Sequence, residues 1–137
     1  MSKYSIHQEF LKEVKIALQI EFPDMRIFDQ HVGMFNTMQG RPIMIGKKGM
    51  ADMFGLLKTP YGLMYIQIEI KTGSAVQNKD QKIWQKFIES MNGVYIVVTD
   101  NKPIKAQIEV IYEWTIRIIE SAHRARISSN TSKGNIQ

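Results

Sequence analysis

The segment that most restricts the fold is Leu63–Lys71, in which apolar residues alternate with tyrosine and polar residues from Met64 onward. A β-strand turns successive side chains to opposite faces, so one face carries the apolar set Met64, Ile66, Ile68 and Ile70. Asn78 and Gln81 then form a capping-box pattern that starts a helix. Val94–Val98 follows as a continuous apolar run, which is typical of a strand covered on both faces. A helix between two strands allows them to lie parallel.

The residues before this unit predict a helix and several shorter strands. Ser5 and Gln8 form a capping-box pattern that opens a helix, and Pro23 ends it. The expected strands are Met25–Phe28, Val32–Asn36 and Met53–Leu57, with a glycine-rich loop over Gly40–Gly49 and a hairpin turn at Thr59–Gly62. Because hairpins connect these strands, we expect an α/β fold with a mixed central sheet flanked by helices.

The C-terminal part predicts a third helix followed by a tail. Pro103 suits the first turn of a helix, and isoleucines repeat after it at helical spacing. Val110 and Trp114 widen this apolar stripe, which indicates either a dimer surface or a fully packed helix. Residues 128–137 are polar and are expected to be disordered, leaving a single domain over residues 1–127.

Composition excludes several classes of protein. The 137 residues include no cysteine, so a disulfide scaffold, a thiol nucleophile and a cysteine-based metal site are excluded. No long apolar run and no signal-peptide pattern are present, so we expect a cytoplasmic protein without membrane contact. The formal net charge is +5, but residues 121–137 hold three basic and no acidic residues, so net charge alone is a weak argument for nucleic-acid binding.

A candidate metal site lies at the end of the alternating strand. Glu69 and Lys71 project from one face, and the main-chain carbonyl of Ile70 lies between them. Asp52 enters the neighbouring strand of the hairpin, so it can lie beside Glu69. Two carboxylates and a carbonyl oxygen suit Mg²⁺ or Mn²⁺. The simpler interpretation of Glu69 and Lys71 is an exposed face or a cross-strand ion pair.

These residues resemble a known family. Asp52 after Gly49, then Glu69-Ile70-Lys71-Thr72-Gly73, then Gln81 with Trp84 and Gly93 resemble, over residues 5–100, the virus-type replication-repair nuclease (VRR-NUC) family. That family belongs to the PD-(D/E)XK nuclease superfamily, which has a restriction-endonuclease-like core. The chain is similar to its stand-alone members from phages and bacteria. Ala51 stands where the name of the superfamily has proline.

The resemblance implies a role for each matching residue. Asp52, Glu69 and the Ile70 carbonyl would bind Mg²⁺ or Mn²⁺, Lys71 would be the catalytic lysine, and Gln81 would help place the substrate or the water. An acidic residue of the first helix often approaches the metal in this superfamily. Glu9 and Glu13 are the two candidates here, and Glu9 is preferred.

Other polar residues allow two interpretations each. Lys47 and Lys48 either bind a phosphate near Asp52 or belong to a solvated loop. Lys82 belongs to a basic helix edge with Lys79 and Lys86, which any solvated helix face can also show. The three histidines, His7, His31 and His123, lack the spacing of zinc ligands and are expected to be surface or capping residues.

The function implied by the resemblance is metal-dependent endonuclease activity on DNA. Stand-alone members of the family act as homodimers on branched DNA such as four-way (Holliday) junctions. The alternatives are a non-catalytic nucleic-acid-binding module of the same fold, which would bind DNA without cleaving it, and a protein-interaction subunit using the Trp114 helix.

Overall fold

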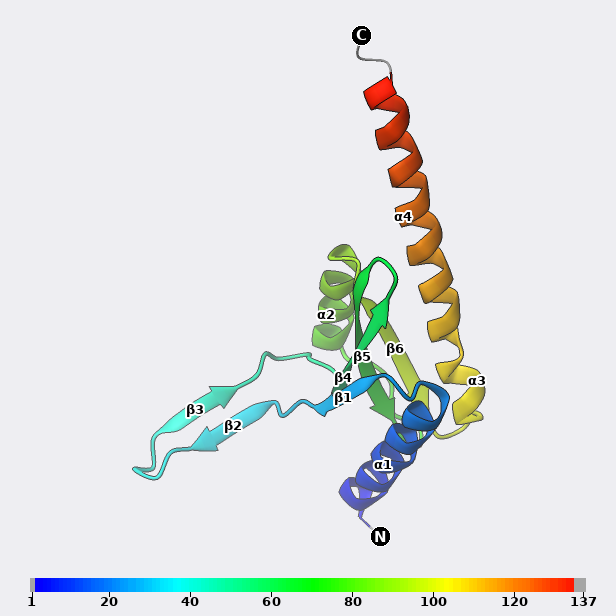
Figure 1. The fold of residues 1–137 in the computed structure, drawn as a ribbon. Helices are drawn as coiled ribbons and strands as arrows, with labels where there is room; N and C mark the ends of the chain where they lie inside the picture. Colours follow the sequence, from blue (N-terminus) through cyan, green and yellow to red (C-terminus); the bar gives the residue numbers. More distant parts are fainter. Residues whose placement is uncertain (1, 135–137) are drawn as a thin grey trace.

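The computed structural model describes residues 2–134 as six strands and four helices (Figure 1). In chain order these are α1 (Lys3–Glu21), β1 (Arg26–Asp29), β2 (Gly33–Asn36), β3 (Pro42–Ile45), β4 (Met53–Thr59), β5 (Gly62–Lys71), α2 (Lys79–Ser90), β6 (Val94–Thr99), α3 (Ile104–Ile108) and α4 (Val110–Gly134).

The central sheet is mixed, as the sequence predicts. Its strand order is β1-β4-β5-β6, in which β4 is antiparallel to both β1 and β5, and β6 is parallel to β5. The hairpin between β4 and β5 turns at Thr59–Gly62, and α2 makes the crossover from β5 to β6. The coarse prediction of an α/β fold with a mixed, helix-flanked sheet is therefore confirmed.

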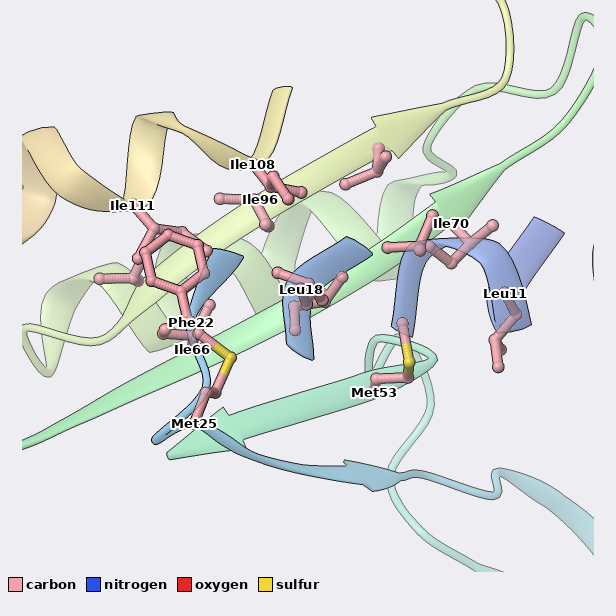
Figure 2. Close-up of a cluster of buried hydrophobic side chains, with 14 of the residues drawn as sticks. Leu11, Leu18, Phe22, Met25, Met53, Ile66, Ile70, Ile96, Ile108 and Ile111 are labelled. Carbon is pink, nitrogen blue, oxygen red and sulfur yellow. The ribbon is translucent and has the colours of Figure 1, made fainter. Parts of the chain in front are cut away.

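The main core lies between the sheet and the layer formed by α1, α3 and the start of α4 (Figure 2). Leu11 and Leu18 of α1 point onto Ile66 and Ile70 of β5, which belong to the apolar face of the alternating strand. The opposite face of β5 turns toward α2 and packs around Ala51, Ile88 and Tyr95, with Trp84 at the margin. Glu69 thus lies on the α2 side of the sheet.

Several predicted helix details are wrong. Ser2, and not Ser5, caps α1, because its side-chain oxygen accepts a hydrogen bond from the Ser5 amide at 3.2 Å. On α2 only Ile88 is buried, whereas the other residues predicted for its buried face (Ile83, Phe87 and Met91, with Trp84 half-buried) are largely exposed. The sheet beneath α2 is narrow, so it covers only part of the helix.

The C-terminal helix also differs from its prediction. It breaks at Glu109 into α3 and α4, and α4 continues through residues 128–134, which the sequence indicates as a disordered tail. Residues 135–137 of that predicted tail lie outside the described residues. Val110, Trp114 and Ile118 pack against the core, so the wide apolar stripe is used within the molecule.

A two-stranded ribbon, β2 and β3, projects from the body of the molecule (Figure 1). Strand β3 falls within the glycine-rich segment that was expected to be a loop. All four β3 residues are exposed, so no alternation of buried and exposed positions marks this strand in the sequence.

Candidate active site at the end of the β4–β5 hairpin

Asp52 lies directly before β4 and is held against β5. Its Oδ2 accepts a hydrogen bond of 2.7 Å from the main-chain amide of Ile70. Met53 pairs with Ile68, so Asp52 falls opposite Glu69 in the same register. A strand residue directs its N–H and C=O to the same side, so the Ile70 carbonyl also faces the Asp52 side of β5. Asp52 and Glu69 therefore lie opposite each other, as the hairpin predicts.

Glu69 is fully buried. Its Oε1 accepts a hydrogen bond of 3.0 Å from the Tyr95 hydroxyl, while its Oε2 has no hydrogen-bond partner among the described residues. Burial raises the pKa of Glu69, the nearby charge of Lys71 and the Tyr95 hydroxyl act to lower it, and the charge of Asp52 raises it further. Burial and the charge of Glu69 likewise raise the pKa of Tyr95. A buried carboxylate oxygen without a partner is costly and calls for an explanation.

Lys71 and Gln81 are brought together by the start of α2. Lys71 Nζ donates a hydrogen bond of 2.9 Å to Gln81 Oε1. The same oxygen accepts from the Asn78 amide at 2.9 Å, while the Gln81 amide donates to Asn78 Oδ1, which completes the predicted capping box. Because Gln81 is fixed by the helix start, it holds the lysine ammonium group in a defined position.

Gln67 is a buried polar residue of this region that sequence reasoning missed. Its Oε1 accepts hydrogen bonds from the Ala51 amide at 3.2 Å, the Trp84 indole at 3.1 Å and the Gln30 side chain at 3.0 Å. These bonds attach the residue before Asp52 to β5 and α2. Trp84 could have indicated a buried polar partner from the sequence, because an indole N–H that packs against a core needs a hydrogen-bond acceptor.

His7, and not Glu9, is the side chain of α1 next to Asp52. His7 Nε2 lies 3.5 Å from Asp52 Oδ1. Glu9 is exposed, and about 200° of helix rotation separates it from His7. His7 shares the inner face of α1 with Phe10 and Val14, which are buried. The helical spacing of His7, Phe10 and Val14 could have indicated this position from the sequence. From the sequence we expected His7 to be a surface or capping residue.

The predicted phosphate-binding lysines lie on the α2 side. Lys47 and Lys48 line a cleft of about 310 Å³ whose other walls are Asp80, Ile83, Trp84 and Phe87. Lys48 Nζ lies 3.4 Å from Asp80 Oδ2, so this lysine already has an acidic neighbour. Lys82 is exposed on α2 and does not line the cleft.

A larger cavity, of about 660 Å³, adjoins the other side of the site. It lies between the start of α1 and the segment after β5, and its lining includes Lys3, Tyr4, His7, Thr72, Ser74 and Asp100. The volume is within the range of small-molecule sites in proteins. His7 lines this cavity and lies 3.5 Å from Asp52, so one wall of the cavity is next to that carboxylate.

The donor set suits a hard divalent cation in an open site. Within residues 2–134, no three His, Asp or Glu side chains form a complete metal-binding cluster. Mg²⁺, however, commonly takes only one or two carboxylates and keeps several waters. The free Oε2 of Glu69, the Asp52 carboxylate and the Ile70 carbonyl are oxygen donors of the required kind.

Comparison with protein-family models and with curated proteins returned no match. Among the described residues, no helix has the length and apolar character needed to cross a membrane.

Proposed function

We propose that the chain is a metal-dependent endonuclease of the VRR-NUC type, with a restriction-endonuclease-like core. The observation that carries this proposal is Glu69, a fully buried carboxylate beside Asp52 and Lys71, one oxygen of which has no hydrogen-bond partner within residues 2–134. Such an arrangement costs stability, and groups with shifted pKa values cluster at functional sites. A bound cation would satisfy the free oxygen.

In the proposal, Asp52, Glu69 and the Ile70 carbonyl hold Mg²⁺ or Mn²⁺. The cation, when bound, supplies positive charge to the scissile phosphate and lowers the pKa of a bound water. The proximity of the Asp52 carboxylate, held by the Ile70 amide at 2.7 Å, to the buried Glu69 supports this assignment.

Lys71 acts on the reacting groups, and Gln81 positions Lys71. The Lys71 ammonium donates hydrogen bonds to the attacking water or to the phosphoryl oxygens, where negative charge grows in the transition state. Gln81 orients Lys71 through the 2.9 Å bond between their side chains. Since Gln81 is itself held by the capping box, it keeps Lys71 oriented before substrate binds.

The substrate we propose is branched DNA, such as a four-way junction, cleaved in the cytoplasm of a bacterial or phage-infected cell. This preference rests on the resemblance of the Asp52, Glu69-Ile70-Lys71 and Gln81 pattern to the stand-alone nucleases. A homodimer would place two such sites about a two-fold axis, which suits paired nicks in strands of like polarity.

The decisive experiment is a cleavage panel with a matched isosteric variant. Labelled four-way junction, flap, duplex and single-stranded DNA are incubated with wild type, Glu69→Gln and Asp52→Asn in Mg²⁺, Mn²⁺ or EDTA. We expect cleavage by wild type in either metal, and a loss of about 100-fold or more in each variant and in EDTA, since each change removes a charge-stabilising group.

A second readout does not depend on activity. Mg²⁺ or Mn²⁺ should raise the Tm of wild type and leave that of Glu69→Gln unchanged, because ligand binding to the folded state is stabilising. Full cleavage in EDTA or by Glu69→Gln would contradict the proposal. Binding of DNA without cleavage in any metal would instead support a non-catalytic module of the same fold.

A further inference from the structure

The charge of this chain is unevenly distributed over its structure. Residues 30–51 and 121–137 together hold six Lys and Arg and no Asp or Glu. The remaining residues, 1–29 and 52–120, hold 12 basic against 13 acidic residues. The whole net charge of +5 therefore comes from two acid-free segments, and the rest of the chain is slightly negative.

A part of each acid-free segment projects from the body of the molecule (Figure 1). In the first it is the β2–β3 ribbon, and in the second it is the distal end of α4 up to Gly134. Within residues 121–132 every residue except Ala122 is exposed, including Arg124 and Arg126. Arg41, Arg124 and Arg126 are therefore exposed on these projections. Lys47 and Lys48 instead line the cleft beside α2, where Lys48 lies 3.4 Å from Asp80.

The ribbon is ordered by its own hydrogen bonds. At its turn, the Thr37 amide donates to the Arg41 carbonyl at 2.8 Å and the Arg41 amide donates to Thr37 Oγ1 at 3.0 Å. Arg41 and the fully exposed Met38 are therefore presented at the tip. Behind them Met34, Phe35 and Ile43 are also exposed.

A two-stranded ribbon with these features fits a nucleic acid. The major groove of B-DNA, about 12 Å wide, admits a two-stranded ribbon. Apolar side chains such as Met, Phe and Ile can contact bases or wedge between base steps, while Arg and Lys contact phosphates. The base of the ribbon returns through Lys47 and Lys48 to Asp52, so a strand on the ribbon leads to the catalytic centre.

We propose that the β2–β3 ribbon and the distal half of α4 are two arms that bind the phosphate backbone of the DNA outside the active site. The identity of the polyanion as DNA rests on the proposed function. The inference that these arms bind a negatively charged polymer rests only on the basic residues of the two acid-free segments. The arms supply the affinity that the nearly neutral body lacks.

The test measures binding without divalent metal, so that cleavage plays no part. Labelled four-way junction and duplex are titrated in EDTA over a range of salt with wild type, Arg41→Gln and the double variant Arg124→Gln/Arg126→Gln. The matched controls are Lys58→Gln and Lys102→Gln, two exposed lysines of the body.

We expect each arm arginine to contribute about one unit to the slope of log Kd against log salt concentration. Arg41→Gln should therefore lower the slope by about one, the double variant by about two, and the controls should match wild type. Wild-type affinity and slope in both arm variants would overturn the proposal, as would a loss confined to the controls.

The competing explanation is that the ribbon contacts a second copy of the chain. A variant in which a short Gly-Ser turn replaces residues 34–44 tests this explanation. Light scattering reports its mass and the salt titration its DNA affinity. Weaker DNA binding at unchanged mass supports the arm. Conversion from dimer to monomer with an unchanged salt slope assigns the ribbon to self-association and overturns the proposal.

The outcomes also separate this proposal from the nuclease proposal. If Arg41, Arg124 and Arg126 are dispensable for DNA binding while cleavage depends on Glu69, the proposed role of the arms is refuted and the nuclease proposal is supported. If the arm variants lose binding as expected while no metal supports cleavage, the arms stand and the nuclease assignment fails.

Discussion

Two buried polar side chains, Glu69 and Gln67, lie on neighbouring positions of the same face of β5 and behave in opposite ways. The Gln67 oxygen accepts from three donors and is satisfied within the fold. Glu69 has one oxygen without a hydrogen-bond partner among the residues that the structure describes. The first arrangement stabilises the segment before Asp52, whereas the second opposes folding when Glu69 is ionised.

The raised pKa of Glu69 predicts the pH dependence of stability without metal. A carboxyl whose folded pKa exceeds its ordinary value of 4.5 contributes stability below that value and loses it as pH rises through the folded pKa. Wild type should therefore lose stability relative to Glu69→Gln as pH rises from 4.5 toward neutrality. Thermal unfolding of both proteins in EDTA from pH 4 to pH 8 checks this.

In that experiment Glu69→Gln should have the higher Tm at pH 7 and no advantage at pH 4. A constant difference in Tm across the range would show that the carboxyl charge is not the cause. The Tyr95 hydroxyl remains available to either side chain at this position.

At the level of elements, the loop from Gly46 to Asp52 positions the site by packing against α2. Gly49 has φ +92°, and a Cβ placed there would clash with the main-chain oxygen of Asp80. Only glycine combines that backbone conformation with so close an approach. Because Asp80 belongs to the first turn of α2, the contact fixes the loop relative to the helix that holds Gln81.

Gly49→Ala should therefore destabilise the protein more than Gly40→Ala. Gly40 also has positive φ, at +79°, but nothing lies within 4 Å of its added Cβ. The backbone term, about 1 kcal/mol, is common to both. The clash adds about 1–3 kcal/mol at Gly49 alone. Urea denaturation midpoints measure the difference, and equal midpoints would mean that the loop moves freely off α2.

The element order was predictable because β5, α2 and β6 carry strong local signals. The strand expected over Leu63–Lys71 and the Asn78–Gln81 capping box are confirmed, although Gln67 and Glu69 on the polar face of the strand are also buried. The ribbon strand β3 was missed because it is exposed on both faces, and the buried face of α2 was overestimated because helix periodicity does not report how much sheet lies beneath it.

At the scale of the whole molecule, a nearly neutral body carries two basic projections. The proximal part of α4 belongs to the core through Val110, Trp114 and Ile118. The distal part, residues 121–132, is exposed along almost its whole length. The boundary between the two lies close to Glu120, the last acidic residue of the chain.

A chain ending at Glu120 should therefore keep the stability of the full chain. Loss of exposed residues outside the core changes the free energy of unfolding by about 0.5 kcal/mol or less. Thermal unfolding followed by circular dichroism measures this, with a smaller helical signal as the expected difference. A fall of many degrees in Tm would show that the distal helix is packed, and a second copy of the chain would be the candidate partner.

The sequence by itself predicted the mixed sheet, the β4–β5 hairpin that allows Asp52 to lie beside Glu69, and the capping box of Asn78 and Gln81. These follow from alternation and local spacing, which are properties of neighbouring residues. Only the tertiary structure decided that His7 and not Glu9 lies next to Asp52 and that Gln67 is buried. It also decided that Lys71 bonds Gln81 and that Oε2 of Glu69 has no hydrogen-bond partner in the described part of the chain. Each of these depends on which elements pack together, because burial and partners arise between segments far apart in the chain.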